Sequence, residues 1–205
     1  MKPEWEILPR IGLGPVRFGM TRDEAVAAGA IFGAVTHEHA KHEADELLAI
    51  LGPSMGEDEA RALIAKMAAD GVDLRPRRHV GFASGLTMNF VADTLETFDA
   101  LPGARDLHIE GVPFFGADPV PALLKFQALN GAPPLMDTRS CLFDALHVST
   151  YDVAVVTAKG LLRLAKSTTM QHLERMVSWG VVSPVGRDLL PRYTRISLEP
   201  LAKLA

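Results

Sequence analysis

The hydrophobic pattern of this chain changes from a helical period to a two-residue period near Arg78. From there to Glu110 apolar residues alternate with polar ones, as in the run from Leu86 to Phe90. A period of two is that of a strand that buries one face. Short turn-forming breaks separate the runs, which predicts antiparallel neighbours in a meander. These breaks lie at 83–85, 92–93 and 102–103.

Three helices are predicted before this change of period. A capping box, with Thr21 at the N-cap and Glu24 three residues later, predicts a first short helix. Leucines at helical spacing predict a second helix over 38–51, which the following Gly-Pro pair would end. Three acids followed by an apolar stripe predict a third helix over 57–70. Helices followed by an antiparallel meander indicate an α+β fold.

A later segment repeats the layout of the first unit. An aromatic extended piece is followed by Asp118 as N-cap, Pro119 at the first helical position and Asn130-Gly131 as a stop. Short strands are predicted after it, over 141–157. We therefore predict an α+β fold of two tandem helix-on-antiparallel-sheet units, with a helical pair inserted in the first. The body would span 1–158, with copies at roughly 9–100 and 101–158.

The remaining segment, 159–205, differs from this body in charge. It holds eight Lys or Arg against three Asp or Glu, a local charge of +5 that leaves −9 on residues 1–158. Ser167 or Thr168 would cap a helix that ends at Gly180. We expect this basic helical segment to pack against the acidic body of its own chain, and a nucleic-acid-binding arm is the alternative.

Composition excludes several classes of protein. The chain has a net charge of −4 and 48% hydrophobic residues, so it resembles neither a basic nucleic-acid-binding protein nor a disordered chain. No run of 18 apolar residues predicts a membrane span. The single cysteine, Cys141, can form no disulfide within the chain. We therefore expect a cytoplasmic protein.

The residues from Gly12 to Thr21 carry a resemblance to known families. The G-M-T-x-x-x-x-V pattern from Gly19 to Val26 resembles the strand-to-helix entry of the BamE (SmpA/OmlA) envelope lipoproteins and the related beta-lactamase inhibitor proteins. The wider G-x-G-P-x-x-x-G-M-T opening is similar to that of small cytoplasmic proteins assigned as immunity proteins of bacterial toxins. This resemblance implies a helix-plus-sheet fold and a protein that binds one partner tightly and occludes it. The chain lacks the lipobox cysteine of the lipoproteins and the paired cysteines of the secreted inhibitors, as expected of an intracellular relative.

Few residues are candidates for catalysis. His37, His39 and His42 lie in the run 37–46 at the start of the second predicted helix. There His39 would share one face with His42 or with Glu43, and the pair could bind a metal. A metal-dependent enzyme or sensor is therefore the alternative function. Ser84 and Cys141 lack the sequence context of an activated nucleophile. We predict no catalytic residue and no cofactor.

Two further clusters have simpler interpretations. The glycines of the opening motif are predicted to form turns, because Pro15 removes a donor that a phosphate cradle would need. Arg75, Arg77 and Arg78 are predicted to be solvated loop charges, and a contact with phosphate or an acidic partner is the alternative.

The predicted sheet has a polar face opposite the helices. If Leu86 and its apolar neighbours face the helices, this polar face carries Thr87, Asn89, His108, Glu110, His147, Ser149 and Tyr151. The resemblance to beta-lactamase inhibitor proteins implies that the sheet side meets the partner. We expect a non-catalytic immunity-type protein that neutralises a cognate bacterial toxin by direct binding. Its acidic body would suit a basic toxin surface.

Overall fold

Glycines of the opening motif shape the first strands in the computed structural model, which describes residues 2–157, 162–165, 175–186 and 189–203. A 3₁₀ turn, η1 (Pro3–Trp5), leads into a small antiparallel sheet of β1 (Ile7–Leu8), β2 (Gly12–Leu13) and β3 (Val16–Arg17). Gly14 turns the chain between β2 and β3 with a φ of +49°, and a Cβ there would lie 2.1 Å from the carbonyl oxygen of Glu4. Only glycine fits this position, so the prediction of a turn-forming glycine is confirmed.

The predicted capping box forms at the start of α1 (Arg22–Ala28). The Glu24 amide donates to Thr21 Oγ1 at 3.4 Å, and the Glu24 carboxylate accepts from the Thr21 amide at 3.0 Å. This second bond lowers the pKa of Glu24 below its ordinary value. A 3₁₀ turn, η2 (Gly29–Phe32), follows directly and ends the helix.

The second predicted helix begins later than expected, so the prediction of helix from residue 38 is wrong. Residues 35–41 form the strand β4 (Val35–Lys41), and α2 (Glu43–Met55) starts only after it. Pairing with β5 (Arg77–Phe82) supplies backbone hydrogen bonds that favour the strand. The helix also runs through the Gly-Pro pair that was expected to end it. The third helix, α3 (Glu57–Ala69), confirms its prediction.

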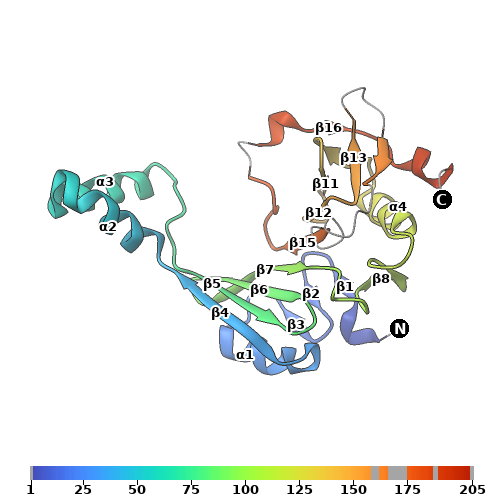
Figure 1. Cartoon of the computed structure of the whole chain (residues 1–205), viewed down its shortest axis with the longest axis horizontal. Coiled ribbons are helices and arrows are strands. Elements are labelled where there is room, and N and C mark those ends of the chain that lie inside the picture. Colours follow the sequence, from blue (N-terminus) through green and yellow to red (C-terminus); the bar gives the residue numbers. More distant parts are fainter. Residues whose placement is uncertain (1, 158–161, 166–174, 187–188, 204–205) are drawn as a thin grey trace.

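The described residues place nine antiparallel strands in one sheet (Figure 1). From one edge to the other the order is β4, β5, β6 (Leu86–Val91), β7 (Thr94–Ala100), β15 (Met176–Gly180), β12 (Val148–Tyr151), β11 (Ser140–Phe143), β10 (Leu135–Met136) and β16 (Thr194–Arg195). Strands β5, β6 and β7 form the predicted meander. Strands β11 and β12 confirm the prediction of short strands within 141–157.

Strand β15 joins the two halves of the sheet, because it pairs with β7 on one side and β12 on the other. The prediction of a helix ending at Gly180 is therefore wrong over Met176–Gly180, and the earlier part of that helix, 167–174, lies outside the described residues. Buried Val177 and Trp179 alternate with Ser178, which is the period of a strand. Otherwise the described part of 175–205 contains β16 and the 3₁₀ turns η4 (Leu190–Arg192) and η5 (Glu199–Lys203), so the C-terminal segment is not simply helical.

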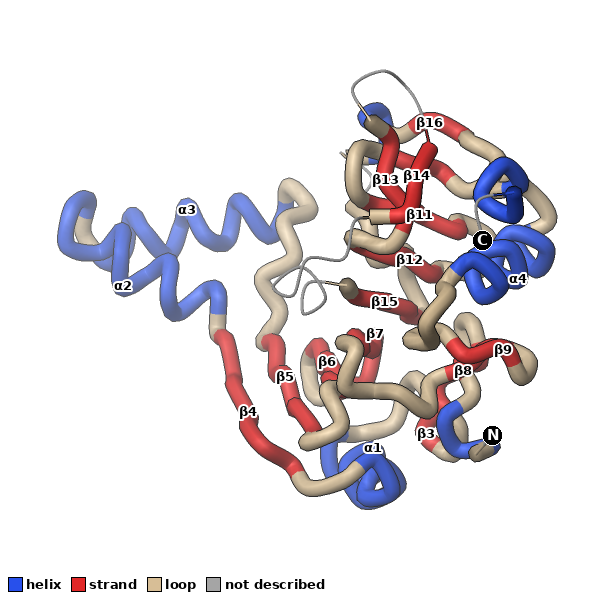
Figure 2. Tube along the Cα trace, turned by 45° about the vertical axis from the view of Figure 1, so that its right-hand side comes forward, coloured by secondary structure: helices blue, strands red, loops and turns tan. Residues whose placement is uncertain are grey.

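One face of the sheet forms the core. A cross-strand ladder of fully buried side chains runs across six strands; its members are Val80, Met88, Phe98, Trp179, Val148 and Phe143. Helix α1 lies against this face at one end, and α4 (Val120–Asn130) lies against it at the other (Figure 2). Asp118 accepts from the Val120 amide at the start of α4, and Gly131 ends the helix with a φ of +71°.

The protein therefore has an α+β fold, with helices packed on an antiparallel sheet. The tandem duplication over 9–100 and 101–158 stays a prediction. The strand predicted around Leu107 does not join the meander, because β8 (His108–Ile109) pairs with β9 (Val112–Pro113) in a separate hairpin. A further hairpin consists of β13 (Ala154–Val156) and β14 (Leu162–Leu164). Among the described residues, no helix has the length and apolar character that a membrane span requires.

Candidate functional site

The predicted polar face forms only in part. Thr87, Asn89, Ser149 and Tyr151 point away from the core, since their cross-strand partners alternate with the buried ladder. In the β11–β12 half, however, β13 lies against β11, and Leu142 on the same face is fully buried. The open part of this polar face therefore lies over β4, β5, β6, β7 and β15.

Besides Ser149 and Tyr151 on β12, three further predicted site residues lie outside this open face, which corrects the sequence prediction. His108 is 4% exposed in the β8–β9 hairpin, where its Nε2 lies 2.9 Å from the carbonyl oxygen of Lys2. Glu110 lies in the turn of that hairpin, at a φ of +43°, and forms an ion pair with Lys125 at 2.7 Å. His147 lies in a turn before β12, with its Nδ1 2.8 Å from the carbonyl oxygen of Val181. His108 is absent from the face because β8 pairs in a separate hairpin, and turns interrupt the two-residue alternation at Glu110 and His147.

A hydrogen-bonded network of side chains crosses the open face from β5 to β15. His79 Nδ1 lies 2.6 Å from Asn89 Oδ1. Asn89 Nδ2 donates to Thr97 Oγ1 at 3.0 Å and to Asp99 Oδ2 at 2.7 Å. On the other side of Asp99, Ser178 Oγ donates to Oδ1 at 2.5 Å, and Ser178 is 6% exposed. Four strands thus fix the position of the Asp99 carboxylate.

This network also fixes the tautomer of His79. An ionised carboxylate only accepts hydrogen bonds, so the amide nitrogen of Asn89 faces Asp99. The amide oxygen of Asn89 therefore faces His79, and Nδ1 of that ring carries the proton. In the neutral imidazole, Nε2 is then left as an acceptor.

The network forms the floor of a cleft of about 830 Å³. One wall is the linker between α3 and β5, with Asp73 and Arg75, and another is the segment after β15, from Val182 to Gly186. A cleft of this size can accommodate a drug-sized ligand or a short protruding loop of another protein.

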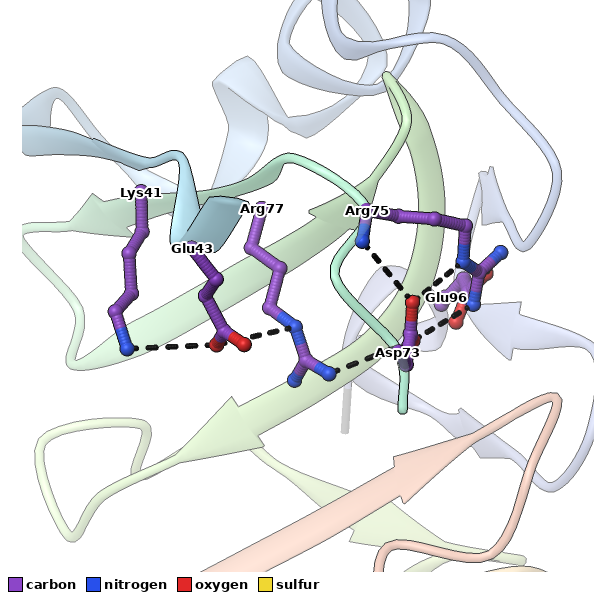
Figure 3. Close-up of polar contacts among 6 residues, drawn as sticks. All are labelled: Lys41, Glu43, Asp73, Arg75, Arg77 and Glu96. Atoms are coloured by element: carbon purple, nitrogen blue, oxygen red, sulfur yellow. Dashed lines mark hydrogen bonds and ion pairs between the residues drawn. The ribbon is translucent and has the colours of Figure 1, made fainter. Parts of the chain in front are cut away.

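The charged wall of the cleft is internally paired (Figure 3). Asp73 lies 2.9 Å from the Arg75 guanidinium and 3.4 Å from that of Arg77. Arg75 also pairs with Glu96 at 3.3 Å, and Arg77 with Glu43 at 3.8 Å. The hydrogen bond from Arg75 lowers the pKa of Asp73 to about 2. The prediction of solvated loop charges is therefore wrong for Arg77 and Arg78, which lie on β5, and all three arginines form ion pairs, Arg78 with Glu38.

Asp99 differs from these acids because no ion pair from the described residues reaches it. Its hydrogen-bond partners within the described chain are the neutral groups of Asn89 and Ser178. A carboxylate has about four lone-pair sites, so both oxygens retain capacity for a further donor. The floor of the cleft thus carries a carboxylate that neighbouring described residues position by hydrogen bonds and not by an ion pair.

The arrangement suits binding better than covalent chemistry. Within the described cleft, the Ser178 hydroxyl is directed at a carboxylate, and His79 is hydrogen-bonded to an amide. Nucleophilic sites instead place an imidazole beside a hydroxyl or thiol. Cys141 lies fully buried on the core side of β11, where burial raises the pKa of its thiol.

The alternative metal site depends on helical spacing of the histidines, but residues 35–41 form the strand β4 and α2 begins only at Glu43. His37 and His39 lie two residues apart on β4, and His42 follows the end of that strand. In the described part of the chain, no three or more His, Cys, Asp or Glu side chains gather as a metal site would require. The spacing argument for these histidines is therefore wrong.

Comparisons with protein-family models, with curated proteins and with solved structures find no match for the chain. The resemblance of the opening motif to immunity and inhibitor proteins therefore stays a prediction. In the structure these residues form turns and a helix cap, which are features of the fold.

The central residues of the cleft could be found in part from the sequence. Asp99 lies between Phe98 and Ala100 in an alternating strand, so the two-residue pattern places it on the polar face. The sequence pattern instead predicts Ser178 in a helix. Its hydrogen bond to Asp99 joins residues 79 positions apart in the chain, which a local pattern cannot reveal.

Proposed function

We propose that this protein binds and occludes a basic protein partner, in the manner of an immunity protein that neutralises a bacterial toxin. The observation that carries the proposal is the α2–α3 hairpin, an acidic helical projection with an apolar surface that no other part of the described chain covers. The open face of the sheet, with its cleft, forms the second part of the proposed surface.

The hairpin extends away from the sheet (Figure 1). No residue of α2 is buried, and Ala60 is the one buried residue of α3. Ile50 is 69% exposed and Leu63 is 36% exposed. A groove of about 350 Å³ between the helices is lined mainly by apolar side chains, including Leu48 and Ile64. Exposed apolar surface of this kind is typical of a protein interface.

Charge indicates the chemistry of the partner. Residues 43–70 hold seven Asp or Glu against two Lys or Arg, a local charge of −5, whereas the whole chain carries −4. Five of these acids are exposed and form no ion pair with any residue that the structure describes: Asp45, Glu46, Asp58, Glu59 and Asp70. A hairpin that carries both exposed apolar side chains and these carboxylates complements a partner surface that combines apolar residues with Lys and Arg.

The same charge disfavours a second copy of this chain as the occupant. Two hairpins docked on each other would bring carboxylates of like sign together, which is unfavourable. A basic partner gains from the opposite field, which also accelerates encounter.

The hairpin and the cleft lie next to each other. Glu43, at the start of α2, pairs with Arg77 on β5, and Arg77 also lines the cleft. The linker from α3 to β5 passes along the cleft wall with Asp73 and Arg75 (Figure 3). A partner seated on the hairpin can therefore reach the open face of the sheet.

Affinity capture from the native host tests this proposal, with the wild type compared to a double variant, Asp58→Lys with Glu59→Lys. We expect the wild type to retain a basic protein that the variant releases. Expression of that protein should arrest growth unless this chain is co-expressed. A matched control, Asp23→Lys with Glu199→Lys, changes the net charge equally at a distance from the hairpin and should retain the partner.

Three results would contradict the proposal. The first is a set of captured proteins that is the same for the wild type and the hairpin variant. The second is a captured partner that is acidic, and the third is a partner whose expression leaves growth unaffected. Far-UV circular dichroism of both variants establishes that the helices remain folded.

A further inference from the structure

We infer that the cleft on the open sheet face receives a cationic side chain, Lys or Arg, of the protein partner, and that Asp99 is the residue that binds it. This inference rests on the proposed function and names the group that the partner inserts.

The cleft holds Asp99 ready for a cation. Asn89 and Ser178 donate to one carboxylate oxygen each, so the plane of the carboxylate is fixed before any ligand arrives. Each oxygen retains a lone pair, and a guanidinium or an ammonium can donate to them. Because the Asp99 carboxylate is already ordered, binding of a ligand costs less conformational entropy than binding to a mobile side chain would.

Other groups of the cleft favour a cation over an anion. The guanidinium groups of Arg75 and Arg77 already pair with Asp73, Glu96 and Glu43. An anion would have to displace these carboxylates and would also approach Asp99. A cation meets the Asp99 carboxylate, which forms no ion pair with any described residue.

The shape of the cleft favours a side chain that is presented by a protein. Its volume of about 830 Å³ far exceeds that of a single Lys or Arg side chain. The space can therefore hold the loop that carries the cation. The apolar part of the lining, with Val182, Pro184 and Met176, can contact the aliphatic stem of such a side chain.

A titration with small probes tests the inference without the partner. Amide ¹H–¹⁵N spectra of the full chain are recorded with N-acetyl-arginine amide and with N-acetyl-lysine amide. N-acetyl-citrulline amide, which is a neutral analogue of the arginine probe, is the reference. We expect shifts at Asn89, Thr97 and Ser178 with one or both cations, with a Kd in the millimolar range, as for a single small contact. Arginine alone would identify a guanidinium site, and both probes would identify a general cation site.

Variants separate the role of the charge from that of the fold. Asp99→Asn should weaken binding of the cationic probes at least about tenfold, the scale of one charged hydrogen bond. Asp106→Asn removes a carboxylate on the Lys2 side of the molecule and should leave binding unchanged. If Asp99→Asn does not fold, Thr97→Lys serves instead, because it places an ammonium beside Asp99 and should exclude the probe.

Several outcomes would overturn the inference. The first is the absence of chemical-shift changes at the cleft up to about 50 mM probe, since a weaker site is not a specific one. The second is binding of the citrulline probe with the same Kd as the cationic probes. The third is unchanged binding of the cationic probes in Asp99→Asn and Thr97→Lys. If the cationic probes do not bind but the wild-type chain still captures its partner through the hairpin, the inference is wrong and the proposed function is not contradicted. Conversely, cation binding in the cleft with no captured partner contradicts the proposed function alone.

Discussion

The indole ring of Trp179 stacks on the phenyl ring of Phe98, with 5.0 Å between the ring centroids and 17° between the ring planes. Phe98 lies on β7 in the β5–β7 meander, whereas Trp179 lies on β15 in the C-terminal segment. The indole Nε1 also donates to the carbonyl oxygen of Gly12 at 3.0 Å. One side chain therefore connects the C-terminal strand, the meander and the opening motif.

Truncation of this side chain should destabilise the whole molecule. Trp179→Ala removes a fully buried ring from the centre of the sheet, and we expect a loss of about 3–5 kcal/mol in the free energy of unfolding. Trp179→Phe keeps most of the packing but leaves the Gly12 carbonyl without its donor, for a smaller loss of about 1–3 kcal/mol. Urea unfolding measures both values. A loss below about 1 kcal/mol for the alanine variant would be inconsistent with the stacked geometry.

A chain that ends at residue 158 should not fold. Strand β15 lies between β7 and β12, so its removal leaves two inner strands with unpaired backbone groups and an opened core. We expect aggregation, or the loss of a cooperative unfolding transition by circular dichroism. A soluble truncated chain with a sharp transition would show that the two halves fold independently.

Acid should weaken the contact between α1 and the sheet edge. Glu38 accepts from Arg22 and from Arg78, each at 2.6 Å, and these hydrogen bonds lower its pKa. A lowered pKa means that the stabilisation is present above the ordinary carboxyl pKa and is lost as the pH falls through the folded value. Glu38→Gln should therefore cost about 1 kcal/mol at neutral pH, because the pair is only partly buried, and less at pH about 3. Equal losses at both pH values in urea unfolding would rule out this linkage.

The Cys141 thiol should be inert in the folded protein. It is fully buried, and burial raises its pKa, so little thiolate forms and reagents have no access. A thiol-reactive dye should label the native chain far more slowly than the chain unfolded in guanidinium. Rapid labelling under native conditions would mean that β11 opens readily or is misplaced.

Apolar residues of the hairpin should matter for binding and not for stability. Ile50→Ser changes a side chain that is 69% exposed, so the free energy of unfolding should change by less than about 0.5 kcal/mol. The same substitution should weaken binding of the captured partner by about 1–2 kcal/mol, as loss of an interface anchor does. Calorimetric titration of the captured partner into the wild type and into Ile50→Ser compares the two Kd values. An unchanged Kd would place the interface elsewhere.

Local patterns predicted the elements whose signals are local. The Thr21–Glu24 capping box, α3 and the β5–β7 meander depend on neighbours within a few residues, and each lies where the sequence indicates. Residues 35–41 show the opposite case. Their polar character suits a solvated helix equally well, and pairing of His39 with His79, 40 positions away, determines the strand.

The candidate site was predictable only as a face. Alternation alone places Asn89 on the polar side of the sheet, and the structure puts it at the centre of the network. Neither the cleft nor the place of Asp99 in its floor can be derived from periodicity, since both depend on β15 and on the linker with Asp73. The exposure of the α2–α3 hairpin likewise depends on β4 being an edge strand of the sheet, since α2 follows this strand.

Hydrogen–deuterium exchange of the full chain, alone and with the captured partner, tests the central claim most directly. We expect slower exchange over 43–75, where the hairpin lies outside the core, and over β7 and β15 beneath the cleft, with little change in α1 and α4. Protection confined to α1, α4 or the β8–β9 hairpin, with unchanged exchange over 43–75, would contradict it.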